Sequence, residues 1–123
     1  MNGWIFIDKP KNITSFKVIK RLKKVLDIKK IGHTGTLDPF ATGILAIALG
    51  EATKSIHYLN QNKVYKFNVV FGELKDTDDI TGKTIKKSNI LPTLDEIDQC
   101  IKKFIGKHRQ IPPQFSAVKV NGK

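Results

Sequence analysis

The apolar residues of this chain recur with three different spacings, and the spacings follow one another in no regular order. Uninterrupted apolar runs at residues 4–7 and 44–49 predict buried strands. Helical spacing in residues 18–26, and again in 94–105, predicts two amphipathic helices. Because strands and helices do not alternate in a steady rhythm, we expect an α+β fold with a mixed, largely antiparallel sheet flanked by helices.

Turn and cap residues set the expected ends of the first elements. Residues 8–10, Asp-Lys-Pro, should turn the chain after the first strand, and Thr14 or Ser15 can cap the first helix. Residues 29–43 are rich in glycine and threonine and show no period, so they predict a long loop. Residues 51–59 predict a short helix after the second strand.

The second half of the chain opens with the third spacing, an alternation typical of a strand. In residues 63–71, Tyr65 and the apolar residues at every second position after it share one face. An acidic loop should follow at residues 72–82, and a further strand is possible at 83–87. Thr93 and Glu96 form a capping-box pattern at the start of the second helix.

The last residues predict the first strand and the turn of a hairpin, but the sequence holds no residues for its second strand. Residues 115–120 read as a strand, and Asn121-Gly122 is a typical two-residue hairpin turn. The sequence stops one residue later, at Lys123. We therefore expect the chain to end inside a structural unit, so that it is truncated relative to the whole domain.

The charge of the chain indicates a polyanionic partner. Lysine and arginine number 22 against 11 acidic residues, a net charge of +11, and many of the cations lie on the outer face of the first predicted helix. The single cysteine, Cys100, cannot form an internal disulfide, and the N-terminus lacks the pattern of a signal peptide. We expect a cytoplasmic protein that binds nucleic acid and no membrane.

Common cofactor and metal motifs fail on spacing. The segment GHTGTLDP is not followed by the Gly-Lys-Ser/Thr of a phosphate-binding loop. The three histidines lack zinc-type spacing, and the aspartates in residues 76–79 lack the later ligands of a calcium loop. We therefore expect neither a cofactor nor a metal.

Asp38 is the best candidate for a chemical role. It follows a stretch, Lys9 to Lys30, with nine basic residues and one acidic residue, and it lies in the glycine-rich loop. Nearby cations favour the charged form of a carboxylate, and the charged form can act as a nucleophile. The alternative is that Asp38-Pro39 only shapes a turn.

His33 and Lys9 are candidates for contacts with nucleic acid, and each has a plainer alternative. His33 can stack on a base or bind phosphate, although an isolated loop histidine often does neither. Tyr65 shares one strand face with Phe67, Val69 and Phe71, so its spacing alone favours a core residue. Lys9 can bind phosphate if the fold places it in a cleft, and otherwise it is an ordinary turn lysine.

These residues lie within motifs that resemble those of the TruB-type tRNA pseudouridine synthases. The resemblance is strongest in residues 32–54, GHTGTLDPFATGILAIALGEATK, and it extends along the chain in order. The other matching segments are Asp8-Lys9-Pro10 with Thr14-Ser15, Lys63-Val64-Tyr65, the loop from Gly72 to Gly82, and IPPQFSAVKVNG at residues 111–122.

The resemblance implies a pseudouridine-synthase-like fold, truncated here to the N-terminal part of the catalytic domain. It implies conversion of the uridine at position 55, in the T-arm of tRNA, to pseudouridine, and we expect the enzyme to be a monomer. Asp38 would be the nucleophile, His33 would contact the RNA, and Tyr65 would stack on the flipped base from the start of its strand. The family's arginine partner of the aspartate lies beyond Lys123, as does its C-terminal RNA-binding region, so we expect residues 1–123 alone to be inactive.

Two alternatives remain open at this stage. The chain can be a non-catalytic RNA-binding module that uses the same basic face. It can also be the catalytic subunit of a guide-RNA-directed pseudouridine synthase, which shares these motifs. The start at Met1 without a long extension favours the stand-alone bacterial type.

Overall fold

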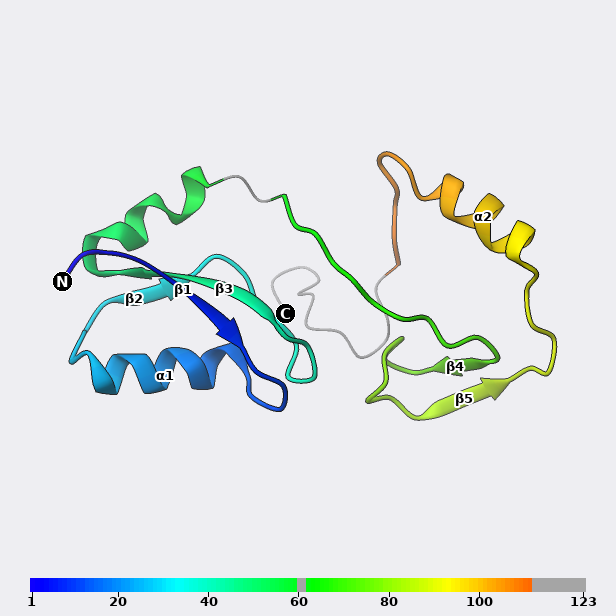
Figure 1. Cartoon of the computed structure of the whole chain (residues 1–123), viewed down its shortest axis with the longest axis horizontal. Helices are drawn as coiled ribbons and strands as arrows, with labels where there is room; N and C mark the ends of the chain where they lie inside the picture. Colours follow the sequence, from blue (N-terminus) through cyan, green and yellow to red (C-terminus); the bar gives the residue numbers. More distant parts are fainter. Residues whose placement is uncertain (60–61, 112–123) are drawn as a thin grey trace. The chain divides into compact units, whose positions relative to one another are not determined.

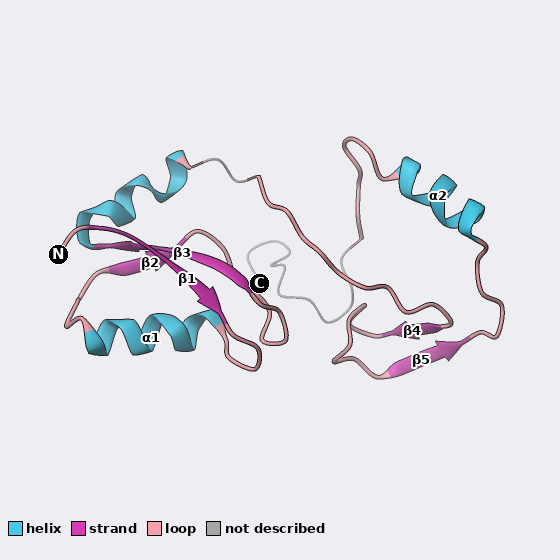
Figure 2. Cartoon of the chain, in the orientation of Figure 1, coloured by secondary structure: helices cyan, strands magenta, loops and turns pink. Residues whose placement is uncertain are grey.

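The computed structural model describes residues 1–59 and 62–111. The chain divides into two compact units, Met1–Val64 and Tyr65–Lys123, and each is considered by itself. The first contains a three-stranded sheet, a helix and a 3₁₀ helix, and the second contains a two-stranded sheet and a helix (Figures 1 and 2). This is the mixed, antiparallel α+β architecture predicted from the apolar spacing.

The sheet of the first unit is built around its third strand in chain order. Strand β3 (Gly43–Leu49) lies between β1 (Gly3–Lys9) and β2 (Ile31–His33), and both pairings are antiparallel. In the register, Ile5 lies opposite Ile47. Since side chains alternate between the two faces of a strand, one face of the sheet is apolar. It carries Ile5, Ile7, Ile31, Leu45, Ile47 and Leu49.

The helix α1 (Ser15–Val25) covers this apolar face (Figure 1). Thr14 caps it, as predicted, by accepting a hydrogen bond from the Lys17 amide. The buried core consists of residues from the helix, the following turn and the central strand: Val18, Ile28, Leu45, Ile47 and Leu49. Burial of apolar side chains at roughly 25 cal/mol per Å² is therefore the main force that holds this unit together.

The 3₁₀ helix η1 (Gly50–Tyr58) lies on the opposite side of the sheet, drawn in green in Figure 1. A Cβ atom added to Gly32 would lie 3.0 Å from Ile56 Cδ1, so glycine allows close packing of η1 on β2. The cover is partial, because Phe6 and Ile44 are largely exposed. The prediction that both apolar runs are buried throughout is therefore wrong at these two residues.

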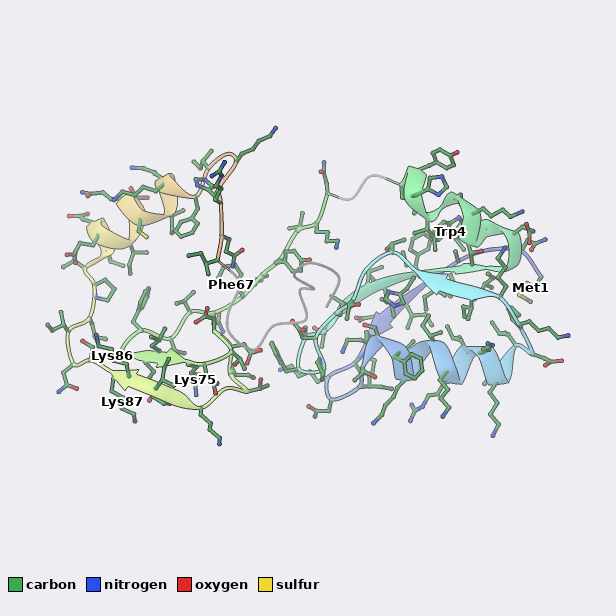
Figure 3. All side chains as sticks on the ribbon, turned by 180° about the vertical axis from the view of Figure 1, so that it is seen from behind. Met1, Trp4, Phe67, Lys75, Lys86 and Lys87 are labelled. Carbon is green, nitrogen blue, oxygen red and sulfur yellow. The ribbon has the colours of Figure 1, made fainter. Side chains whose placement is uncertain are left out.

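In the second unit, β4 (Glu73–Lys75) pairs antiparallel with β5 (Thr84–Lys87), and α2 (Leu94–Lys103) follows. Figure 3 labels Lys75, Lys86 and Lys87 on this small sheet. The predicted capping box of α2 is confirmed: the Glu96 amide donates to Thr93 Oγ1 at 3.3 Å, and the Thr93 amide donates to a Glu96 carboxylate oxygen at 2.7 Å. Among the described residues of this unit, none is buried.

Two predicted loops contain short strands, and one predicted strand is not formed. β2 lies inside the predicted loop at 29–43, and β4 lies inside the predicted loop at 72–82. Residues 62–70 have no strand pairing with any described part of the chain, although their side chains alternate, and Phe67 is among their exposed side chains (Figure 3). A strand needs a hydrogen-bonded neighbour, which side-chain alternation does not report. The predicted strand at 115–120 and the turn at 121–122 lie outside the described residues.

Candidate active site

The loop from Thr34 to Thr42 joins β2 to β3 and carries Asp38. The two strands are antiparallel neighbours, and the Thr34 amide still donates to Ala46 O at 3.1 Å beyond the last paired residue of β2. A turn follows in which the Ala41 amide donates to Asp38 O at 3.1 Å. The sheet therefore anchors both ends of the loop, and Asp38 lies near its middle.

The carboxylate of Asp38 is exposed at the tip of this loop. Within residues 1–59 and 62–111 it makes no hydrogen bond or ion pair. An exposed carboxylate without a local partner can approach a ligand, but its own contacts do not fix its direction. Its position depends on the backbone on either side.

Ser15 holds the residue that precedes Asp38. Its side chain is 1% exposed, and it is the first residue of α1. Ser15 Oγ accepts a hydrogen bond from the Leu37 amide at 2.9 Å and donates one to Leu37 O at 3.1 Å. The sequence offered Ser15 as an alternative helix cap and as part of a matching motif, and its pairing with a residue 22 positions away has no local signal.

Pro39, which follows Asp38, is held from the other side. Its carbonyl accepts hydrogen bonds from the Asn12 amide at 2.7 Å and from Lys9 Nζ at 3.3 Å. Asn12 has a φ of +64°, a left-handed conformation that asparagine tolerates better than most residues. The residues on both sides of Asp38 are thus tied to the segment that joins β1 to α1.

Lys9, for which we predicted an RNA contact if the fold placed it in a cleft, is buried in the fold. The residue is 0% exposed, and its ammonium donates to Pro10 O at 2.9 Å and Ile13 O at 2.8 Å as well as to Pro39 O. An ammonium has three N–H donors, and all three have carbonyl partners here. Lys9 is turned inward and positions the loop, so this geometry does not support a direct contact with phosphate. The sequence showed that residue 9 is a cation but not that its side chain points inward.

His33 ends β2 immediately before the loop and is partly buried. Its Nδ1 lies 2.6 Å from Gly35 O. Because a carbonyl oxygen only accepts, Nδ1 must carry the hydrogen in this contact, which leaves Nε2 as the nitrogen for any second partner. The hydrogen bond fixes the orientation of the ring relative to the loop.

Lys63 adds a cation to the loop that sequence reasoning did not select. A Cβ atom added to Gly35 would lie 3.1 Å from Lys63 Nζ, so the ammonium lies close to the backbone of the loop. Tyr65, two residues later, is the first residue of the second unit, and its side chain is 63% exposed. The structure therefore brings His33, Lys63 and Asp38 to one loop.

The described residues contain no group of three or more histidine, cysteine, aspartate or glutamate side chains able to hold a metal ion. None of the helices in the described part of the chain has the length and hydrophobicity needed to cross a membrane.

Comparison with known proteins gives consistent matches. Residues 23–123 match the model of the family described as "TruB family pseudouridylate synthase (N terminal domain)". The chain is 54% identical to the tRNA pseudouridine synthase B of Ehrlichia ruminantium (strain Gardel) over 123 residues, which are 99% of this chain and 42% of that protein. It is 50% identical to the protein of the same name from Roseobacter denitrificans, over 99% of this chain and 41% of that protein. The chain thus spans about two fifths of the length of these relatives.

One solved structure is similar over nearly the whole chain. It is a chain in the "Crystal Structure of a Cbf5-Nop10-Gar1 Complex", with a TM-score of 0.60 and 31% identity over 95% of this chain and 31% of that one. The likeness confirms the fold class expected from the motifs.

Proposed function

Because the chain belongs to the TruB family of pseudouridylate synthases, we propose that it forms the N-terminal part of the catalytic domain of a tRNA pseudouridine synthase, with Asp38 as the nucleophile. One observation carries the assignment of Asp38. An exposed carboxylate lies in a loop whose backbone is held on both sides by buried donors and acceptors. The names of the relatives support tRNA as the substrate.

The proposed reaction is an isomerisation. The bond between uracil N1 and the ribose C1′ breaks, the base rotates, and a bond forms between C5 and C1′. C5 loses its hydrogen as a proton and N1 gains one, so the products contain the same atoms and electrons as the substrate. This balance consumes neither water nor an oxidant, and the protein must supply a nucleophile, a pocket for the base and a proton acceptor.

The target base must leave its stack to reach a loop such as this one. Extrusion of a nucleotide costs about a few kcal/mol. Stacking on an aromatic side chain can return roughly 1–3 kcal/mol, and Tyr65 is the proposed platform, with His33 filling the space that the base vacates. The exposure of Tyr65 and the fixed ring of His33 are compatible with these roles.

The outer face of α1 is the proposed contact with the tRNA backbone. Its cationic stripe is Lys17, Lys20, Arg21 and Lys24, all exposed and spaced so that they share one face. None of the four is ion-paired within the described ranges, whereas Lys30 and Lys54 both pair with Glu51. The stripe spans about 10 Å along the helix and can bind successive phosphates.

Finer features of the function are proposed from the family resemblance. The substrate is uridine 55 in the T-arm, the enzyme acts as a monomer in the cytoplasm, and it uses neither metal nor cofactor. Residues 1–123 alone are inactive, because the remainder of the catalytic domain is needed.

The test is Asp38→Asn in the full-length enzyme, with pseudouridine formation in tRNA as the readout. The change keeps the shape of the side chain and removes the charge needed for attack, so we expect turnover to fall by roughly 10³-fold or more, as for other nucleophiles. Binding of tRNA should stay within about a few-fold, since the phosphate contacts are retained.

Asp27→Asn is the matched control. Asp27 is also exposed, and its φ of +49° suits asparagine, so the same charge change should leave turnover unaltered. If Asp38→Asn retains turnover, Asp38 is not the nucleophile. If neither the wild type nor any variant forms pseudouridine while all bind tRNA, the protein is a non-catalytic RNA-binding module.

A further inference from the structure

The Ser15 hydroxyl makes two hydrogen bonds that the start of a helix does not require. A residue at a helix start commonly uses its side chain to cap an exposed amide of the first turn. Here Thr14 performs that task through its hydrogen bond with the Lys17 amide. The Ser15 hydroxyl instead bonds both backbone groups of Leu37, and the residue is almost fully buried.

These two hydrogen bonds to Leu37 also constrain the backbone of Asp38. Leu37 and Asp38 share a peptide bond, and Leu37 O, which accepts from Ser15, belongs to that peptide unit. A peptide unit is planar, so fixing its oxygen fixes the direction of the Asp38 N–Cα bond. Since the carboxylate of Asp38 has no hydrogen bond elsewhere in the described chain, this backbone direction is the main determinant of where it points.

The two ends of the Asp38 segment are held by different means. On the Pro39 side, Lys9 and Asn12 bond to a single carbonyl. On the Leu37 side, one buried hydroxyl satisfies both a donor and an acceptor. Removal of that hydroxyl leaves both Leu37 groups without the partner they have now, while Lys9 and Asn12 still hold the Pro39 side.

We propose that Ser15 is a positioning residue for the nucleophile: its hydroxyl fixes the Leu37–Asp38 peptide and thereby directs the Asp38 carboxylate at the substrate. This inference rests on the proposed role of Asp38. A purely structural role for Ser15 would affect folding and leave the chemical step alone. A positioning role lowers the rate of the chemical step while tRNA still binds, because a displacement of about 1 Å can cost roughly 10²-fold in rate.

The experiment is Ser15→Ala in the full-length enzyme, with kcat, KM and tRNA Kd measured beside thermal unfolding. We expect kcat to fall by about 10- to 100-fold while KM and Kd stay within about twofold. Ser55→Ala is the matched control, since Ser55 Oγ donates to the backbone at Ala52 O at 2.7 Å in η1, away from the loop. It should lower the melting temperature by a few degrees, about as much as Ser15→Ala does, and leave kcat unchanged.

A second variant keeps the proposal testable if Ser15→Ala does not fold. Ser15→Thr retains the hydroxyl and should keep kcat within about threefold of wild type at any temperature where the variant is folded. Ser15→Cys, close in size but a weak donor, should give an intermediate kcat. The inference is wrong if folded Ser15→Ala keeps its kcat within twofold, or if Ser15→Cys equals wild type in kcat. A loss confined to Kd would likewise overturn it, since Ser15 would then act on RNA binding.

Failure of this inference and failure of the proposed function give different results. If Asp38 is not the nucleophile, Asp38→Asn retains turnover whatever the serine variants do. If Asp38 is the nucleophile but Ser15 does not direct it, Asp38→Asn is inactive while Ser15→Ala has a normal kcat.

Discussion

The two α-helices of this chain have similar lengths, caps and apolar spacing but very different surroundings. α1 has 11 residues and α2 has 10, and each is preceded by a threonine that caps its first turn. Each also has apolar side chains at helical spacing. In α1 these side chains pack on the core, with Val18 buried and Leu22 partly buried. In α2 none of them is buried: Ile97 is partly buried, and Leu94 is 84% exposed.

The contrast shows that local sequence makes a helix and that burial requires a second element. The partners of α1 are the three strands of its own unit, which lie within the first 49 residues. Every buried apolar residue of the described chain belongs to this unit. The unit of α2 has a two-stranded sheet, and a hairpin of that size is marginally stable by itself.

The polar faces of the two helices differ as well. α1 has no acidic residue in its first turn and carries the cationic stripe. α2 has Asp95 and Glu96 in its first turn, and Lys102 pairs with Asp98 at 2.5 Å. Mixed charges of this kind keep a helix soluble, whereas an unpaired stripe of one sign attracts a polyanion.

The largest expected difference between the helices is in stability. Leu22→Ala removes apolar contacts with the core and should lower the free energy of unfolding by about 2 kcal/mol, at the lower end for leucine because the residue is partly buried. Leu94→Ala is the matched control on α2 and should cost less than about 0.5 kcal/mol. Urea unfolding of the 123-residue chain measures both.

The cost of the same two variants in the full-length protein tests whether the contrast between the helices holds there. If Leu94→Ala then costs as much as Leu22→Ala, another part of the protein covers α2, and the contrast belongs to the 123-residue chain only. If Leu94→Ala costs as much in the 123-residue chain itself, the exposure of α2 seen here is wrong.

A smaller difference is expected in tRNA binding. Lys20→Gln with Lys24→Gln removes two cations of the stripe and should weaken binding about tenfold at low salt. Each phosphate contact contributes about 0.7–0.9 to the steepness with which log K falls as log salt rises. Loss of two contacts should therefore reduce the magnitude of the slope by about 1.5. The control, Lys102→Gln with Lys103→Gln on α2, should leave the slope unchanged. Equal losses of tRNA affinity from the two double variants would show that binding depends on net charge and not on the position of the cations.

The sequence predicted best the features that depend on neighbours along the chain. Both helices, both threonine caps and the strands β1 and β3 follow from spacing and local hydrogen bonding, and the structure confirms them. β2 was missed because three residues, one of them Gly32, carry no period, and only their pairing with β3 makes them a strand. The predicted strand at 63–71 failed for the converse reason, since it has the alternation but no partner in the described chain.

The sequence predicted which residue types lie in the candidate site but not where their side chains point. Asp38 and His33 were selected from the loop that contains them, and they lie in one loop region of the structure. Lys9 was selected as a cation for RNA, yet it faces inward because three carbonyls surround its ammonium. Ser15 was missed as a site residue, because a hydrogen bond between residues 22 positions apart depends on the folded chain.

The smallest expected difference between the helices is in the response of their caps to pH. The backbone amide and then the hydroxyl of Thr93 donate to the Glu96 carboxylate and hold its pKa below the usual value of 4.5. A lowered pKa in the folded state means that the contribution of Glu96 is complete above pH 4.5 and is lost as the pH falls through the lowered pKa. The cap of α1 uses the neutral hydroxyl of Thr14, so it has no such dependence.

Amide chemical shifts during an acid titration separate the two caps. The Thr93 amide, 2.7 Å from the Glu96 carboxylate, should shift with a midpoint below pH 4.5, and the Lys17 amide should not shift in that range. In Glu96→Gln the Thr93 transition should disappear, because glutamine does not titrate, while α2 keeps its threonine cap. A Lys17 transition at the same midpoint would mean that the two helices unfold together, and the independence of their caps would be refuted.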